Sequence, residues 1–305
     1  MAPSAKTSVE VDGRALALSN LDKVLYPATG TTKGEVIDYY ARIAPTLLAH
    51  VGDRALTLKR YPDGVDGQFF FQKRCPDHRP DWVPTAVGPG DREGEIRYCC
   101  LDSRAALVWS ANLAAIELHA PMARAADLER ATMVVFDLDP GAPADIVDCA
   151  EVALWIRDTL DGLGLRCSPK TSGSKGMQVY LPVNGPGIAH DHASGFAHAV
   201  ALALERHHGD RVLSAMKRDL RGGKVFIDWS QNSRHKTTVA PYSLRARPRP
   251  TASTPLRWSE VEACAAGDAP PLSFELGEVL ARVETDGDRF ADVLTVEQTV
   301  PRPPK

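Results

Sequence analysis

Residues 134–141 read Val-Val-Phe-Asp-Leu-Asp-Pro-Gly, and the interpretation of the whole chain starts from this stretch. Its apolar, β-branched start predicts a buried strand, which the Pro-Gly pair ends. Because side chains alternate along a strand, Asp137 and Asp139 project from the same face at its carboxyl end. Such a pair is typical of a divalent-cation site, since Mg²⁺ and Mn²⁺ prefer carboxylate oxygens. An Asx-type turn at a strand end is the alternative interpretation.

A second strand is predicted over residues 224–229, which read Lys-Val-Phe-Ile-Asp-Trp and carry Asp228 inside an apolar run. An aspartate in such a run is costly unless it is paired or bound to a metal. If the two strands are neighbours, Asp228 completes a three-carboxylate site. Sites of this kind hold two metal ions for phosphoryl or nucleotidyl transfer.

The composition of the 305-residue chain is that of an ordinary globular protein, with 44% hydrophobic and 25% charged residues. No apolar run approaches the ~20 residues of a membrane span, and the first residues lack the plan of a secretory signal. We therefore expect a cytoplasmic protein without a membrane partner. A net charge of −3 argues against unspecific coating of nucleic acid. Six cysteines without a C-x-x-C pair favour reduced thiols over a zinc ribbon or a disulfide framework.

The first third of the chain contains local signals that predict short elements. Residues 9–19 alternate around an Asp-Gly turn, which predicts a hairpin. Thr32 and Glu35 form a capping-box pattern for the helix that follows. Lys33 then lies in the first helical turn, where backbone N–H groups favour a phosphate, although a solvated lysine is the commoner meaning of such a residue.

Aromatic and helical patterns follow. Phe-Phe-Phe-Gln-Lys-Arg at 69–74 combines base-stacking rings with cations, as single-stranded nucleic acid requires, or else the three rings fill a core. Apolar spacing over residues 103–120 predicts a helix that brings His119 near a strand. A lone histidine there is more often a packed core residue than a ligand.

Two further stretches indicate a partner that carries phosphate. Thr-Ser-Gly-Ser-Lys-Gly at 171–176 has the small residues that let backbone N–H groups approach an anion, although a flexible turn is the alternative. A Walker A loop is excluded by the spacing and by the strand that follows. Residues 217–249 carry nine Lys or Arg against two Asp, a formal charge of +7. Beside a metal site this run favours polyphosphate and nucleic-acid backbone.

Taken in order, these motifs resemble the archaeo-eukaryotic primase superfamily, and within it the polymerase domain of the bacterial end-joining DNA ligase D and its stand-alone primase-polymerase relatives. Asp-Leu-Asp-Pro-Gly (137–141) resembles the first motif of that family, Ser-Gly-Ser-Lys-Gly (172–176) the second, and Val-Phe-Ile-Asp-Trp-Ser-Gln-Asn (225–232) the third. The flanks at 20–33 and 236–245 resemble it as well. The resemblance covers about residues 15–260. One departure is Gln178, where the family usually has a histidine.

The resemblance implies a template-directed nucleotidyltransferase that adds ribonucleotides in preference to deoxyribonucleotides at DNA ends and short gaps, with two Mn²⁺ or Mg²⁺ ions. The metal ligands that it implies are Asp137, Asp139 and Asp228. The triphosphate ligands are Ser172, Lys175, Arg221 and Arg245, and the other residues of the nucleotide pocket are Lys59, His119 and Gln231. For DNA it implies Lys23 and Lys33 on a downstream 5′-phosphate, and Phe70 and Phe71 as template-stacking rings.

The implied partners are gapped or broken DNA with a 5′-phosphate, NTP or dNTP, a DNA ligase and Ku, for a monomer that acts on the bacterial nucleoid. The chain is expected to be either a stand-alone enzyme or one domain of a ligase. A metal-dependent nuclease would also use three carboxylates, but it would degrade DNA without added nucleotide. A catalytically silent DNA end-binding module would show no metal-dependent incorporation.

The expected architecture is α/β, with a mixed sheet like that of an RNA-recognition motif carrying the aspartates, packed against an N-terminal α/β subdomain. The expected boundaries are a flexible N-terminus over residues 1–15 and a catalytic domain over 16–290. Within that domain the N-terminal part ends near residue 125, the catalytic part near 260 and the closing helices near 290. A tail over 291–305 follows.

Overall fold

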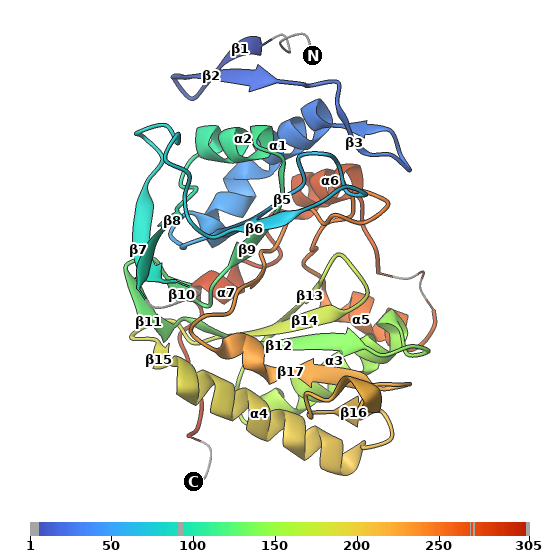
Figure 1. Cartoon of the computed structure of the whole chain (residues 1–305). Helices are drawn as coiled ribbons and strands as arrows, with labels where there is room; N and C mark the ends of the chain where they lie inside the picture. Colours follow the sequence, from blue (N-terminus) through green and yellow to red (C-terminus); the bar gives the residue numbers. More distant parts are fainter. Residues whose placement is uncertain (1–5, 91–93, 269, 271, 303–305) are drawn as a thin grey trace. The chain divides into compact units, whose positions relative to one another are not determined.

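The structure is a computed structural model that describes residues 6–90, 94–268, 270 and 272–302 (Figure 1). It has a mixed α/β architecture and divides into two compact units. Unit 1 comprises Met1–Ala120, Val239–Ala252 and Phe274–Gly287, and unit 2 comprises Pro121–Thr238, Ser253–Ser273 and Asp288–Lys305. The expected terminal segments lie partly outside the described residues, and the expected domain boundaries stay a prediction.

Unit 1 is built around a four-stranded sheet in the order β18-β9-β5-β6, accompanied by three two-stranded ladders, β1-β2, β3-β4 and β7-β8. The strands are β1 (Lys6–Val11), β2 (Arg14–Ser19), β3 (Val24–Tyr26), β4 (Thr31–Thr32), β5 (Thr57–Arg60), β6 (Phe70–Gln72), β7 (Thr85–Pro89), β8 (Glu95–Cys99), β9 (Ala115–Ala120) and β18 (Thr238–Val239). The predicted hairpin is confirmed as the β1-β2 ladder.

The helices of unit 1 are α1 (Lys33–Val51), α2 (Arg104–Asn112) and α6 (Leu276–Asp286). The predicted capping box is confirmed, because the Thr32 hydroxyl accepts from the backbone N–H of Glu35 while the Glu35 carboxylate accepts from that of Thr32. Helix α1 packs against α2 and α6, and Val36, Tyr40 and Ile43 on its inner face are buried in the core of this unit.

The helix predicted over residues 103–120 is wrong in its second half. Helix α2 ends at Asn112, and residues 115–120 form strand β9 instead. Ala114, between the two elements, has a φ of 58°, a left-handed conformation that ends a helix. The apolar spacing was misleading because β9 lies inside the sheet, where both of its faces are buried.

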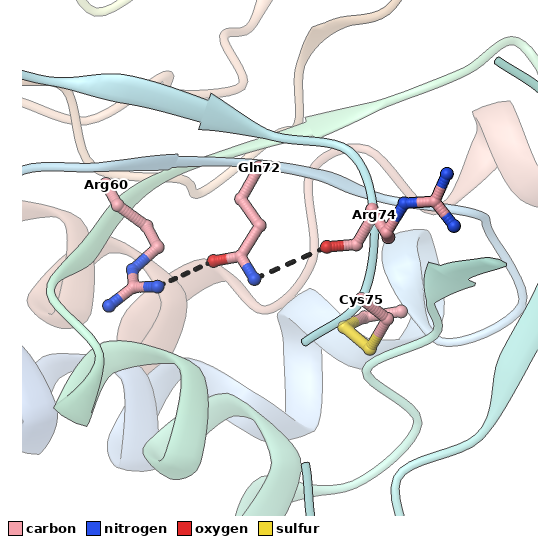
Figure 2. The surroundings of a disulfide bond; sticks show 5 residues. Arg60, Gln72, Arg74 and Cys75 are labelled. Atoms are coloured by element: carbon pink, nitrogen blue, oxygen red, sulfur yellow. Dashed lines mark hydrogen bonds between the residues drawn. A yellow bond between two sulfur atoms is a disulfide. The ribbon is translucent and has the colours of Figure 1, made fainter. Parts of the chain in front are cut away.

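Unit 1 also contains a disulfide between Cys75 and Cys99, whose surroundings are shown in Figure 2. Cys99 ends β8, and the backbone N–H of Cys75 donates to the carbonyl of Arg97 at 2.7 Å, which holds the two cysteines side by side. The expectation of reduced thiols is therefore wrong for this pair, because a separation of 24 residues in sequence carries no sign of the contact. Cys100, Cys149, Cys167 and Cys264 are free.

Unit 2 contains a five-stranded sheet in the order β13-β14-β12-β17-β16 and a smaller sheet in the order β10-β11-β15. In the larger sheet all pairs are antiparallel except β16-β17, so the sheet is mixed. The strands are β10 (Ala123–Arg124), β11 (Asp127–Ala131), β12 (Met133–Pro140), β13 (Ser168–Thr171), β14 (Met177–Pro182), β15 (Ile188–Ala189), β16 (Val212–Leu213) and β17 (Val225–Asp228).

Four α-helices belong to unit 2, namely α3 (Ile146–Asp161), α4 (His190–His207), α5 (Trp258–Ala265) and α7 (Asp292–Thr295), together with the 3₁₀ turns η1 (Arg218–Leu220) and η2 (Trp229–Asn232). Helices α3 and α4 pack against the larger sheet and against each other (Figure 1). The central strand β12 is buried from Met133 to Phe136, and its exposed end carries the aspartates. Within the described ranges, no helix has the length and apolarity that a membrane crossing requires.

Candidate active site

Three carboxylates meet on two neighbouring strands of unit 2. Asp137 is paired with Asp228 across the antiparallel β12-β17 ladder, and Asp139 lies two residues further along β12 on the same face. One carboxylate oxygen of each aspartate lies within 4.8 Å of the other two. The structure thus brings together the three aspartates that were expected to meet if their strands were neighbours.

The negative charge of this aspartate triad (Asp137, Asp139 and Asp228) is poorly compensated by the protein. Burial, the charge of Asp139 and that of Asp228 raise the pKa of Asp137 to about 7, although a hydrogen bond from Gln178 opposes the shift. A divalent cation would remove this repulsion, and carboxylate oxygens are the ligands that Mg²⁺ and Mn²⁺ prefer. The donor set of the triad therefore fits such a cation.

The carboxylate of Asp228 is oriented by its own neighbours in sequence. Its Oδ1 accepts from the backbone N–H of Ser230 at 3.1 Å and from the Ser230 hydroxyl at 2.6 Å. Its Oδ2 accepts from Gln231 Nε2 at 2.8 Å. Gln231, predicted to line the nucleotide pocket, thus contacts a candidate metal ligand directly and holds it in place.

The loop between β13 and β14 carries Ser172 and Lys175. The Ser172 hydroxyl accepts from the backbone N–H groups of Ser174 and Gly176, each at 3.2 Å, which closes the loop on itself, while Lys175 remains exposed. A Cβ atom on Gly176 would lie 1.9 Å from the backbone oxygen of Leu138 in β12. Only glycine therefore lets this loop approach the strand of the aspartates so closely.

Arg221 reaches the triad from the loop before β17. Its Nη1 lies 3.9 Å from Asp139 Oδ2, and its guanidinium lies 3.8 Å from the centre of the Phe226 ring. A Cβ atom on Gly141 would lie 1.9 Å from the backbone oxygen of Arg221, so this glycine too permits a close backbone approach. Ser172, Lys175 and Arg221 are hence all carried by loops that contact β12 or the residue after it.

Unit 1 contains a second polar cluster, in which a single carboxylate is surrounded by cations. Glu117 of β9 is 2% exposed and accepts from His119 Nε2 at 2.8 Å. Arg245 Nε lies 3.3 Å from its Oε2 and Lys59 Nζ lies 3.7 Å from its Oε1. We call Glu117, Lys59, His119 and Arg245 the Glu117 cluster.

The electrostatics of the Glu117 cluster differ from those of the triad. Burial alone would raise the pKa of Glu117, but the hydrogen bond from His119 and the charges of Arg245 and Lys59 hold that pKa well below its ordinary value. Burial lowers the pKa of His119, so its ring is neutral and donates its Nε2 proton to the carboxylate. The cluster accordingly keeps an excess of positive charge.

Exposed aromatic rings adjoin the Glu117 cluster. Lys59 Nζ lies 4.2 Å from the centre of the Phe69 ring, and the Phe71 and His119 rings are in edge contact. Phe69, Phe70 and Phe71 are 51%, 44% and 55% exposed, which excludes the alternative that all three fill a core.

Strand β6, which carries two of these rings, is fixed by the hydrogen bonds in Figure 2. Arg60 Nη1 donates to Gln72 Oε1 at 2.7 Å, and Gln72 Nε2 donates to the carbonyl of Arg74 at 3.3 Å. The disulfide of Cys75 follows directly. The aromatic segment thus ends in a region that is cross-linked to β8.

Lys23 and Lys33 lie side by side in unit 1. The backbone N–H of Lys33 donates to the carbonyl of Lys23 at 2.8 Å. Lys23 Nζ pairs with Asp63 at 2.9 Å, whereas Lys33 is buried and its Nζ donates to the carbonyl of Ser19 at 2.6 Å. Burial, Lys23 and Arg60 lower the pKa of Lys33 to about 8. These two lysines are the pair that the resemblance assigns to a 5′-phosphate.

The family described as LigD, primase-polymerase domain, matches residues 32–290. The chain belongs to this family. It is 44% identical over 282 residues to the multifunctional non-homologous end joining DNA repair protein LigD of Mycobacterium tuberculosis, and the match covers 90% of this chain and 36% of that protein. It is 28% identical over 286 residues to the bifunctional non-homologous end joining protein LigD of Bacillus subtilis, covering 94% of this chain and 45% of that protein.

The fold of the LigD primase-polymerase family is also found in a solved structure, the polymerase domain from Mycobacterium tuberculosis ligase D in complex with DNA. The two chains are 42% identical and superpose with a TM-score of 0.85, covering 92% of this chain and 98% of the other. The α/β architecture expected from the sequence is therefore confirmed. Family membership identifies the chain as a primase-polymerase, which is a nucleotidyltransferase.

The site residues that the family resemblance implies belong to two groups, one in each unit. The residues in unit 2 are those of the triad together with Ser172, Lys175, Arg221 and Gln231. Those in unit 1 are Lys23, Lys33, Lys59, Phe70, Phe71, His119 and Arg245. Sequence reasoning missed Glu117, which joins three of the predicted residues. The alternation of Glu117 and His119 along a strand could have revealed it, had the segment been recognised as a strand.

Proposed function

We propose that the chain is a template-directed repair polymerase that extends DNA at ends and short gaps during end joining, with a preference for ribonucleotides. The single observation that carries this proposal is the triad, in which three carboxylates from two strands converge beside the Ser172–Gly176 loop. Its family membership supports the same activity. The names of the relatives, which are end-joining proteins, support the repair context and partners such as a DNA ligase and Ku.

Asp137, Asp139 and Asp228 would hold two divalent cations, Mn²⁺ or Mg²⁺. When bound, these ions lower the pKa of the primer 3′-hydroxyl and neutralise charge on the triphosphate. Gln178 and Gln231 orient two of the ligand carboxylates by donating to Asp137 and Asp228. The primer 3′-oxygen would form a bond to the α-phosphorus as the bond from that phosphorus to pyrophosphate breaks. The hydroxyl proton would pass to solvent, so no protein side chain is needed as general base.

The incoming triphosphate is proposed to contact Ser172, Lys175 and Arg221. The close approach of their loops to β12 supports this, because it keeps the cations of Lys175 and Arg221 near the carboxylates. For the pyrophosphate that leaves, Lys175 and Arg221 supply positive charge. We propose that the nucleotide also contacts Arg245, Lys59 and His119. The net positive charge of the Glu117 cluster supports this contact.

The proposed DNA contacts lie in unit 1. Phe70 and Phe71 are exposed rings on which template bases can stack, and Arg60, 5.0 Å from the centre of the Phe70 ring, adds a cation near the backbone. Lys23 and Lys33 are proposed to bind a downstream 5′-phosphate. Such an anion would offset the charges of Lys23 and Arg60, which together with burial lower the pKa of Lys33.

The test is primer extension on gapped DNA bearing a 5′-phosphate, with NTP or dNTP and with Mn²⁺ or Mg²⁺. Asp139→Ala should reduce incorporation by roughly 10²–10³-fold or more, because it removes charge stabilisation from the reacting groups. DNA binding, measured in parallel by fluorescence anisotropy, should persist. Equal extension by the variant would refute the proposal, and degradation of labelled DNA without nucleotide would show a nuclease instead.

A further inference from the structure

A lysine is fully buried in the same sheet as the triad, two strands away from Asp137. Lys170 lies on β13 with 0% exposure, and its Nζ donates to the Gln178 side-chain oxygen at 2.5 Å and to the Ser253 hydroxyl at 2.6 Å. Burial of an amino group is costly, and these two acceptors offset part of that cost. The chain thus maintains a buried donor at this point of the sheet.

Lys170, Gln178, Asp137 and Asp228 form one row across four neighbouring strands. Lys170 is paired with Gln178 between β13 and β14, Gln178 with Asp137 between β14 and β12, and Asp137 with Asp228 between β12 and β17. Side chains in such a row lie on the same face of the sheet and contact their neighbours. Gln178 Nε2 completes the connection by donating to Asp137 Oδ1 at 3.0 Å.

The lysine determines which way the Gln178 amide points. A side-chain amide has a donor end and an acceptor end that are almost equal in shape, so only its partners fix its orientation. Because a lysine ammonium can only donate, the amide oxygen faces Lys170 and the NH₂ group faces Asp137. The reversed amide would put two donors together at Lys170 and two oxygens together at Asp137.

We propose that Lys170 is a positioning residue that acts through the Gln178 amide to hold the Asp137 carboxylate in place for a divalent cation. This inference rests on the proposed function. The NH₂ group of Gln178 donates to Oδ1 of Asp137 and would leave its Oδ2 available to a cation. Groups that orient a metal ligand in this way typically contribute 10–100-fold to metal affinity.

The experiment is a double-mutant cycle on Mn²⁺ affinity, measured by electron paramagnetic resonance of the free ion, in the absence of DNA and nucleotide. Lys170→Met keeps the length of the side chain and removes the donor, and Gln178→Leu removes the amide. Each single variant should weaken Mn²⁺ binding by roughly tenfold. The double variant should bind as weakly as Gln178→Leu alone, because both changes interrupt the same connection.

A charge-matched control is Arg206→Met, which removes one exposed cation from the last turn of α4 in unit 2 and should leave Mn²⁺ affinity unchanged. The inference is overturned if folded Lys170→Met binds Mn²⁺ as tightly as wild type. It is also overturned if Lys170→Met still weakens Mn²⁺ binding tenfold in the Gln178→Leu background. If wild type binds no Mn²⁺, the proposed function fails together with the inference. If wild type and Lys170→Met bind Mn²⁺ equally well, only the inference fails and the proposed function stands.

A second variant covers the case in which Lys170→Met does not fold. Ser253→Ala keeps the lysine but removes one of its hydrogen-bond acceptors, the Ser253 hydroxyl, which loosens the hold of Lys170 on the amide. We expect about a threefold loss of Mn²⁺ affinity in the wild-type background and none in the Gln178→Leu background. An effect of equal size in both backgrounds, or in neither, overturns the inference.

Discussion

The aspartate triad and the Glu117 cluster have opposite distributions of charge. In the triad three carboxylates converge, with Arg221 3.9 Å from Asp139 and the Gln178 amide donating to Asp137. In the Glu117 cluster one buried carboxylate is in contact with His119, Arg245 and Lys59. The pKa of Asp137 is raised to about 7 by burial and by its acidic neighbours, whereas the pKa of Glu117 is held well below its ordinary value.

The difference distinguishes a cluster whose charges favour a bound cation from one that the protein completes with its own side chains. Repulsion between neighbouring carboxylates is relieved by a bound cation, or by protonation at low pH, so the triad is organised to bind a cation at neutral pH. A carboxylate with several cationic partners stabilises the fold. The cluster around it has a surplus of positive charge, which would attract an anion. The following predictions test this distinction, from the largest effect to the smallest.

The largest effect on stability is expected from Glu117→Ala. The substitution leaves Lys59 and Arg245 partly buried without their common carboxylate, and loss of one partner of a buried pair costs about 3–5 kcal/mol. Thermal unfolding followed by circular dichroism should show a Tm decrease of roughly 6–20 °C at the usual 2–4 °C per kcal/mol. Glu117→Gln, which retains a hydrogen-bond acceptor, should lose less. A wild-type Tm for Glu117→Ala would mean that the cluster contributes nothing to the fold.

Asp137→Asn should increase the stability of the protein at alkaline pH, whereas Glu117→Ala should decrease it. Because folding raises the pKa of Asp137 from 3.8 to about 7, stability from this group is present at pH 4 and is lost as pH rises through 7. At pH 8 without divalent cations, the variant should exceed wild type by about 1 kcal/mol, or roughly 2–4 °C in Tm. The advantage should vanish at pH 4.

Addition of Mn²⁺ provides the control for this prediction. Wild type should then gain stability by mass action, while Asp137→Asn should gain less because it has lost a ligand carboxylate. If the variant is less stable than wild type at pH 8 in the absence of cations, repulsion within the triad is not the dominant effect there.

The smallest effect is expected for Lys33, a buried cation that lies beside a second cation, Lys23. Burial, Lys23 and Arg60 lower the pKa of Lys33 to about 8, so its positive charge is lost as pH rises above that value. The preference for gapped DNA with a 5′-phosphate over the same DNA without it should therefore fall between pH 7 and pH 9, by about 1 kcal/mol or less. Lys33→Met should show no such pH dependence. A preference that stays constant in wild type would exclude Lys33 as the phosphate ligand.

Much of the candidate site could be predicted because its signals are local or periodic. Asp137 and Asp139 share a face by the two-residue period of a strand, and the Pro-Gly pair marks where that strand ends. The capping box of Thr32 and Glu35 needs only four residues. Asp228 is a polar residue in an apolar run, and a buried carboxylate requires a reason.

The rest depends on contacts between segments that are distant in sequence. Strand β9 has the apolar spacing of a helix because it is buried on both faces, so the role of Glu117 was not visible. Cys75 and Cys99 meet only after β6 and β8 have been placed. The link from Lys170 to Asp137 depends on strand register, which a single sequence does not specify.

The contact between Gly176 and the backbone of Leu138 has a consequence for the precision of the reaction. The spacing between the Ser172–Gly176 loop and the aspartate strand is determined by main-chain atoms, which lack the rotamer freedom of side chains. Thermal fluctuation of individual side chains will hence leave this spacing largely intact. A methyl group at residue 176 would displace the loop from β12 and so change the distance between its side chains and the aspartates.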